Sequence, residues 1–208
     1  MSLEHRIYLA SRSPRRRELL AQIGLGFDML LFRLPPREDP EVDETWHGQE
    51  APAEYVQRVA RAKARHGANL LVTRSLPLRP VLAADTTIDF DGEVIGKPAD
   101  EADAMAILAR LSGRSHRVLT AIAVARRDKD AEQLECVLSA SEVRFRDLAS
   151  DEIRRYVQSG EPMDKAGAYG IQGRAAMFVA EIHGSHCGIV GLPLCDTVLL
   201  LRKVGCPI

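Results

Sequence analysis

Long apolar runs, net charge and a cysteine framework are all missing from this chain of 208 residues. No window reaches the ~18 consecutive apolar residues of a membrane span, and no apolar stretch of signal-peptide length precedes the charged residues near the start. The four cysteines show neither a C-x-x-C pair nor the dense, even spacing of a disulfide framework, so we expect reduced thiols. These absences predict a cytoplasmic protein without a membrane partner.

The charge balance is close to neutral, with 28 basic and 29 acidic residues. Such a balance creates no global field that attracts nucleic acid or an anionic membrane, so nucleic acid is not an expected partner and any polyanion site must be local. The composition, 46% hydrophobic and 27% charged, is that of a folded globular protein. The length predicts a single domain over residues 1–208.

Apolar patterning along the chain predicts a mixed α/β fold. Strands are expected at residues 6–10, 27–32, 81–84, 86–90, 93–95, 118–125, 134–145 and 176–182. Helices are expected at residues 14–23, 52–67, 102–111 and 193–204, with a further helix capped by Ser150. The Asp91-Gly92 pair predicts a hairpin turn, which makes the sheet partly antiparallel. The polar, proline-containing segment 33–50 is expected to be a long loop.

A candidate phosphate site lies at the start of the first predicted helix. Ser11, Ser13, Arg15 and Arg16 surround this helix N-terminus, directly after a short apolar strand. Free N–H groups and the helix dipole favour an anion there, and the carboxyl end of a buried strand is where α/β proteins bind ligands. An ordinary N-cap with solvated arginines would give the same pattern.

Two carboxylates are candidates for metal binding or acid–base chemistry. Asp85 follows the apolar run 81–84, where a carboxylate is costly unless it is paired, metal-bound or exposed in a cleft. It could instead be a turn residue that caps the start of the hairpin. Glu44 could supply a second hard oxygen ligand for Mg²⁺, or it could be a solvated acid in the polar loop.

Three other patterns do not support the motifs that they approximate. The segment 92–98 is one residue too short for a P-loop and has proline where the magnesium-binding hydroxyl belongs. Lys97 in that segment could still reach a ligand phosphate, or it could be a surface lysine. The glycines of 167–173 lack the dinucleotide-binding spacing, and the two histidines and the cysteine of 183–187 match no zinc site, so no zinc is expected.

Six blocks, in order, resemble the Maf-like nucleoside triphosphate pyrophosphatases: SRSPRRRELL, EYVQRVARAKA, LAADTTIDFDGEVIGKP, LSGRSHRV, GEPMDKAGAYGIQG and IVGLPL. The resemblance covers about residues 7–205. It implies a mixed twisted sheet flanked by helices, two lobes around a substrate cleft, and a homodimer. It also implies cleavage between the α- and β-phosphates of a nucleoside triphosphate with a divalent cation, Mg²⁺ or Mn²⁺. The run DKAGAYGIQG resembles the branch that acts on dTTP and UTP.

The resemblance also implies roles for individual residues. Asp85 matches the catalytic proton acceptor, and with Glu44 it forms the acidic pair near the metal. Arg15, Thr86 and Gln172 match positions tied to substrate choice, and the amide of Gln172 suits the hydrogen-bonding edge of uracil or thymine. The residues matched to phosphate binding are Ser11, Ser13, Arg15, Arg16, Lys63 and Lys97.

Two alternative functions stay open at this point. One is a regulator of cell division that binds nucleotide or nucleic acid through residues 11–17 and does not catalyse a reaction. Acidic residues inside a basic cleft argue against it, because they would repel the ligand of a pure phosphate-binding surface. The other is a pyrophosphatase acting on 7-methyl-GTP. The sequence assigns no role to His183, His186 or the loop at 33–41.

Overall fold

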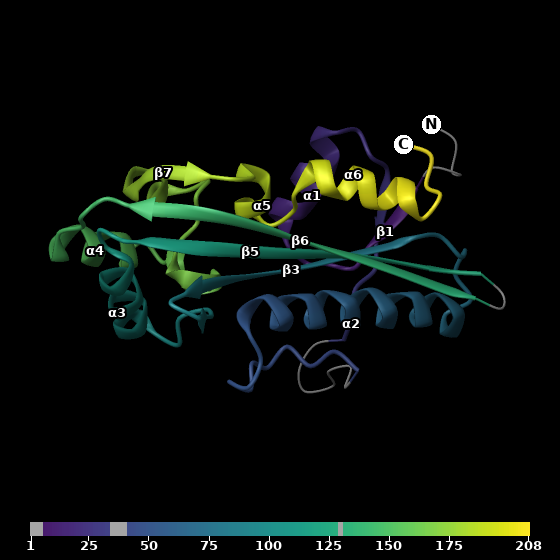
Figure 1. Cartoon of the computed structure of the whole chain (residues 1–208), viewed down its shortest axis with the longest axis horizontal. Coiled ribbons are helices and arrows are strands. Elements are labelled where there is room, and N and C mark those ends of the chain that lie inside the picture. Colours follow the sequence, from purple (N-terminus) through teal and green to yellow (C-terminus); the bar gives the residue numbers. More distant parts are fainter. Residues whose placement is uncertain (1–5, 34–40, 129–130) are drawn as a thin grey trace.

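The computed structural model describes residues 6–33, 41–128 and 131–208. Within these residues the fold is built on one seven-stranded sheet in the order β2-β1-β3-β5-β6-β7, with β4 paired to β3 (Figure 1). The strands are β1 (Ile7–Leu9), β2 (Phe27–Met29), β3 (Val81–Phe90), β4 (Glu93–Ile95), β5 (Ser115–Arg127), β6 (Glu132–Phe145) and β7 (Val179–His183). β1 is parallel to β2 and β3, and the other pairs are antiparallel, so the predicted mixed sheet is confirmed.

Helices cover both faces of this sheet. They are α1 (Pro14–Gln22), α2 (Pro52–Thr73), α3 (Glu101–Leu111), α4 (Ser150–Val157), α5 (His186–Val190) and α6 (Leu194–Lys203). Single turns of 3₁₀-helix lie at Glu161–Asp164, Ala166–Ala168 and Arg174–Phe178. In Figure 1, α2 runs along one face of the long strands, while α1 and α6 lie on the other. The predicted α/β class with flanking helices is confirmed.

The middle strand β3 packs against helices on both faces because its side chains alternate. Val81 and Ala83 belong to the apolar cluster formed with α2, whereas Leu82 and Ala84 belong to the cluster formed with α1 and α6. On the α2 side small residues permit a close approach. A Cβ on Gly67 of α2 would lie only 2.7 Å from Val81 Cγ1. The sheet and α2 are therefore held in tight contact.

A gap in the strand pairing of β3 positions the candidate site. On one edge of β3, β1 pairs only as far as Leu82, and β4 begins to pair at Ile88. Between these points the described residues place no strand on that edge, while β5 pairs with β3 from Val81 to Asp89 along the other. A ligand in such a gap can reach side chains from both faces of a single strand. Asp85 and Thr86 lie in it.

Two predicted boundaries along this part of the chain are wrong. Asp85 does not end a strand: the polar run after Ala84 continues the same ten-residue strand, because its backbone ladder to β5 is unbroken. Gly67 does not end the second helix, which continues to Thr73. This glycine is present because α2 approaches Val81 closely, not because the helix stops.

Other differences are local. The predicted strand 27–32 is regular only over β2, and the strand predicted at 176–182 is β7, since residues 174–178 form 3₁₀-helix. The predicted serine cap is wrong, because Ser150 is the first residue of α4 and Ala149 is the N-cap. The Ala149 backbone N–H donates to the Glu152 carboxylate. The five-residue α5 was not predicted. Residues 41–50 form neither helix nor strand, as expected, while 34–40 lie outside the described residues. None of the described helices has both the length and the apolar character for crossing a membrane.

Candidate active site

A cavity of about 1430 Å³ opens at the gap beside β3. It brings together segments that are far apart in the sequence: the turn into α1, the loop before α2, the middle of β3, the end of β4 and the segment 161–173. All ten residues predicted for the site line it: Ser11, Ser13, Arg15, Arg16, Glu44, Lys63, Asp85, Thr86, Lys97 and Gln172.

The turn between β1 and α1 is organised around one arginine. Ser11 Oγ accepts hydrogen bonds from the Ser13 backbone N–H (3.2 Å) and from Arg16 Nη1 (3.1 Å). Arg16 also donates from Nη2 to Thr86 Oγ1 (3.2 Å) and from Nε to the Gly191 carbonyl (2.9 Å). Burial lowers the pKa of this guanidinium, although the nearby carboxylates act in the opposite direction. Arg16 therefore links α1 to β3 and to the turn after α5, beside a helix N-terminus that attracts anions.

The hydroxyl of Thr86 extends this hydrogen-bond network to the neighbouring strand β5. It lies 2.9 Å from Thr120 Oγ1 on β5, and Thr120 donates to the Gly188 carbonyl in α5 (2.8 Å). Because Thr120 uses its single hydroxyl hydrogen for Gly188, Thr86 is the donor between the two threonines. The Thr86 oxygen then accepts from Arg16, so the orientation of this hydroxyl is fixed from both sides.

On the other face of β3, two carboxylates meet one lysine. Lys63 Nζ of α2 donates to Asp85 Oδ1 (2.9 Å) and to Glu44 Oε2 (2.7 Å). The side chains of Lys63 and Asp85 are 11% and 14% exposed, whereas that of Glu44 is 58% exposed. The fully regular elements α2 and β3 thus hold an ion pair inside the cavity, and the loop adds a second carboxylate from its solvent side.

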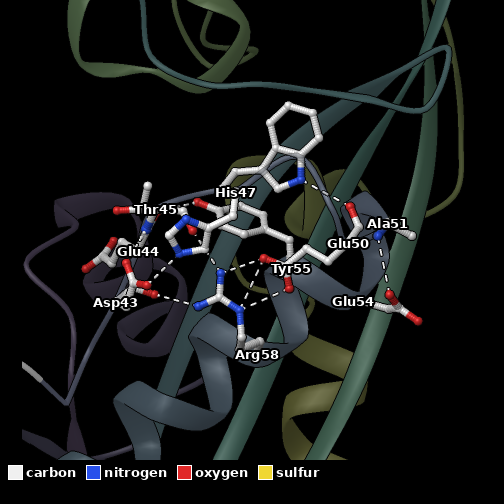
Figure 2. A network of polar contacts seen from close by, with 10 residues as sticks. Asp43, Glu44, Thr45, His47, Glu50, Ala51, Glu54, Tyr55 and Arg58 are labelled. Carbon is white, nitrogen blue, oxygen red and sulfur yellow. Dashed lines mark hydrogen bonds and ion pairs between the residues drawn. The ribbon is translucent and has the colours of Figure 1, made fainter.

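The loop residue Glu44 reaches this lysine because α2 holds the loop. Figure 2 shows the residues around it, with Tyr55 and Arg58 of α2 pointing at the backbone of the loop. Tyr55 donates its hydroxyl hydrogen to the Glu44 carbonyl (2.8 Å). Burial, reinforced by the Asp85 and Glu44 carboxylates, raises the pKa of Tyr55 to about 12, so the phenol remains a donor at neutral pH.

The segment 161–173 provides a further part of the lining. Lys165 Nζ donates to the Glu161 carbonyl and to the Asp164 carboxylate, each at 2.5 Å. Glycines allow these side chains to lie against the chain: a Cβ on Gly170 would be 2.7 Å from Lys165 Cε, and one on Gly173 would be 2.0 Å from Glu161 Oε1. Gly170 and Gly173 are therefore explained by close packing around two charged side chains, whereas Gly167 lies against Ile88 and has a φ of +70°.

A buried histidine anchors the same segment to the sheet. His116 Nε2 on β5 lies 2.8 Å from the hydroxyl of Tyr169, and Tyr169 lines the cavity. Burial lowers the pKa of His116 to about 4, so the ring is neutral at pH 7. Gln172, three residues beyond Tyr169, is exposed to the cavity.

The residues present fit a divalent cation that is shared between protein and substrate. A carboxylate oxygen of Glu44 and one of Asp85 lie near each other, since both contact Lys63 Nζ. Mg²⁺ is commonly held by one or two carboxylates together with substrate phosphates. Among the described residues, no group of three or more His, Cys, Asp or Glu side chains could hold a metal by itself. Two residues of the 183–187 segment, for which the sequence predicts no zinc site, contact neighbouring side chains. His183 Nε2 lies 2.9 Å from Glu181 Oε1, and Cys187 Sγ lies 3.2 Å from Ser185 Oγ.

Comparison with known proteins gives a consistent result. A family model described as "Maf-like protein" matches residues 6–204. This chain belongs to the Maf-like family. Similar to it are proteins named dTTP/UTP pyrophosphatase from Dechloromonas aromatica (60% identity, 96% of this chain and 98% of the relative) and Aromatoleum aromaticum (57%, 99% and 98%). A third, from Burkholderia pseudomallei, is 55% identical over 94% of this chain and 92% of the relative. The predicted membership is confirmed.

Several residues of this Maf-like site were not singled out from the sequence. Tyr55 belongs to the block EYVQRVARAKA, where its spacing from Lys63 was a usable signal. Lys165 lies in the run DKAGAYGIQG, and it is one of only five lysines in the chain. Thr120 and Gly191 act through a buried hydroxyl and a backbone carbonyl, for which the sequence holds no comparable signal.

Proposed function

We propose that this Maf-like protein is a nucleoside triphosphate pyrophosphatase that hydrolyses dTTP and UTP to the nucleoside monophosphate and pyrophosphate. The observation that carries the proposal is the contact of Lys63 with Asp85 and Glu44 inside a cavity that also holds the Ser11–Arg16 turn. This contact supports the proposal because it brings an acidic pair into the same cavity as a candidate phosphate-binding turn. The relatives with 55–60% identity are named for this activity.

The basic side chains of the cavity suit a triphosphate. Arg15, Arg16, Lys63 and Lys97 offset its negative charge, and the N-terminus of α1, with Ser11 and Ser13, adds hydrogen-bond donors. Charge develops on the phosphate oxygens during the reaction, so fixed cations stabilise the transition state more than the bound substrate. The hydrogen bonds that hold Arg16 mean that it needs little reorganisation to do so.

Asp85 is the proposed catalytic residue. Its carboxylate orients a water molecule and accepts a proton from it while the water oxygen bonds to the α-phosphorus. The bond from the α-phosphorus to the oxygen bridging to the β-phosphate breaks, and pyrophosphate leaves with that oxygen. Lys63 holds Asp85 in place through Oδ1.

A divalent cation, Mg²⁺ or Mn²⁺, is part of the proposal. When bound it neutralises phosphate charge and polarises the reacting phosphoryl group. Glu44 and Asp85 would hold it, because these two carboxylates share a contact with Lys63 inside the cavity. Lys63, which lies between them, would then contact the substrate phosphates.

The proposed base selection depends on Arg15, Thr86 and Gln172. An exposed glutamine amide offers one acceptor and two donors to the edge of uracil or thymine. Thr86 has its hydroxyl committed to Arg16 and Thr120, so it sets the shape of this part of the cavity and holds Arg16. A homodimer, two lobes and a cytoplasmic location remain part of the proposal.

Pyrophosphate release from a panel of nucleotides tests the function. We expect kcat/KM for UTP and dTTP to exceed that for CTP, GTP and 7-methyl-GTP, and we expect activity to be lost in excess chelator. Gln172→Ala should reduce the preference for UTP over GTP by about tenfold, because a site that hydrogen-bonds a base rejects ligands that leave its polar groups unpaired. A preference for 7-methyl-GTP would overturn the substrate assignment, and nucleotide binding without hydrolysis would favour the regulator.

A further inference from the structure

The loop 41–50 presents Glu44 without any regular structure of its own. An exposed side chain on an irregular segment loses conformational entropy when it is fixed, so something must hold the loop for Glu44 to be placed reproducibly. The backbone contacts of the loop therefore decide where the second carboxylate of the site lies.

One arginine of α2 makes two of these contacts. Arg58 donates from Nη1 to the Asp43 carbonyl (2.8 Å) and from Nη2 to the Thr45 carbonyl (2.9 Å). Its Nε and Nη2 also form a bidentate pair with the Glu50 carboxylate, at 3.0 Å and 2.6 Å (Figure 2). The two carbonyls lie on either side of Glu44. The guanidinium thus fixes the backbone immediately before and after the carboxylate, and it fixes the far end of the loop as well.

Neighbouring contacts complete the arrangement. Tyr55, one turn before Arg58, donates to the carbonyl of Glu44 itself, so three successive carbonyls are held by two side chains of one helix. Lys63 on the same helix donates a hydrogen bond from Nζ to Glu44 Oε2 (2.7 Å). The helix that carries the lysine of the site therefore also sets the position of the loop acid.

We propose that Arg58 is a positioning residue for the pyrophosphatase reaction: by holding the carbonyls of Asp43 and Thr45 and the carboxylate of Glu50, it places Glu44 against Lys63 and beside Asp85. The inference rests on the proposed function. A lysine cannot replace Arg58, because its single ammonium cannot reach the separate acceptors that the planar fork joins.

The loop carries its own reporter. Trp46 is the single tryptophan of the chain, and its Nε1 donates to the Glu50 carbonyl (3.1 Å) within the segment that Arg58 holds. Its fluorescence therefore measures loop docking without any reference to catalysis. Release of the loop should shift its emission towards that of a solvated tryptophan.

The test uses Arg58→Ala and Arg58→Lys, Glu44→Ala, and the double variant Glu44→Ala/Arg58→Ala. Arg61→Ala is the matched control, because Arg61 is exposed on the same helix and, within the described residues, its side chain donates a hydrogen bond only to Gln57. For each protein, kcat and KM for UTP, Trp46 emission and Tm are measured. We expect both Arg58 variants to lose kcat by about 10–100-fold, the range found for residues that orient metal or catalytic ligands.

The double variant separates positioning from general destabilisation. If Arg58 acts through Glu44, its removal adds nothing once Glu44 is alanine, so the double variant should match Glu44→Ala within about twofold. Trp46 emission should shift in both Arg58 variants and stay unchanged in Arg61→Ala. Multiplicative losses in the double variant, or lost activity with unchanged Trp46 emission, would overturn the positioning role.

The outcomes for the two proposals are distinct. Wild-type protein that releases no pyrophosphate from any nucleotide overturns the proposed function, and the catalytic part of this inference with it. An active wild type with an equally active Arg58→Ala variant overturns the inference alone.

Discussion

Asp85 and Glu44 contact the same ammonium group from two different kinds of structure. Asp85 lies in the middle of a ten-residue strand, with a side chain that is 14% exposed. Glu44 lies in a segment without helix or strand, with a side chain that is 58% exposed. The backbone ladder to β5 fixes the first, whereas side chains of α2 fix the second through carbonyls. The Maf-like site thus combines a rigid acid, Asp85, which the sheet fixes, with an adjustable acid, Glu44, whose loop is held by side chains of α2.

The largest effect is expected when the rigid acid loses its charge. Asp85→Asn keeps the shape of the side chain but removes the proton acceptor, so kcat should fall by about 10³-fold, within the range for a general base. Pyrophosphate release from UTP measures the loss, and Tm shows whether the fold is intact. Wild-type turnover in this variant would contradict the catalytic role of Asp85.

A smaller effect is expected for the acid on the loop. Glu44→Gln should lower kcat by about tenfold, and it should raise the concentration of Mg²⁺ needed for half-maximal rate, because one hard oxygen ligand is weakened. A titration of the rate against Mg²⁺ measures both quantities. If Glu44→Gln and Asp85→Asn proved equally inactive, the distinction between a rigid and an adjustable acid would fail.

The smallest effect on turnover is expected for the segment that includes Tyr169, where the expected change is one of stability. Burial lowers the pKa of His116 to about 4, so between about pH 6.5 and pH 4 the unfolded chain binds a proton that the folded chain does not. The free energy of unfolding should therefore fall as the pH drops through this window, by about 1–3 kcal/mol from this group. Urea unfolding of wild type and His116→Gln at several pH values isolates the contribution. Parallel curves for the two proteins would show that His116 does not cause it.

The sequence predicts which positions lie together in the cavity better than it predicts the secondary structure that holds them. All ten predicted positions line one cavity. They could be chosen from the sequence because the blocks that carry them resemble a known family. The pattern nevertheless predicts that the strand ends at Asp85, because Asp85, Thr86 and Thr87 interrupt the apolar run. Local patterning cannot show that hydrogen bonds to β5 continue through a polar stretch. The sequence shows directly which residue types are present, whereas the pairing of β3 depends on β5, a strand that is distant in the sequence.

The contacts of Arg58 show the same limit from another side. An arginine on a helix face is normally a solvated charge, and the carbonyls that it binds are present at every residue of the chain. Nothing in the sequence specifies which of them it will meet. Gly67 is a further case: a glycine within an apolar helix pattern is typical of a helix end, and only the approach of Val81 explains why it lies inside one.

The gap beside β3 lets one strand serve two separate tasks. Successive side chains of a strand point to opposite faces, so Asp85 meets α2 while Thr86 meets α1, although the two residues are neighbours in the chain. Deleting one residue between Leu82 and Asp85 would bring the Thr86 hydroxyl to the position that faces Lys63, whereas inserting one would bring the Asp85 carboxylate to the position that faces Arg16. The site should therefore depend on the length of this strand as well as on the identity of its side chains.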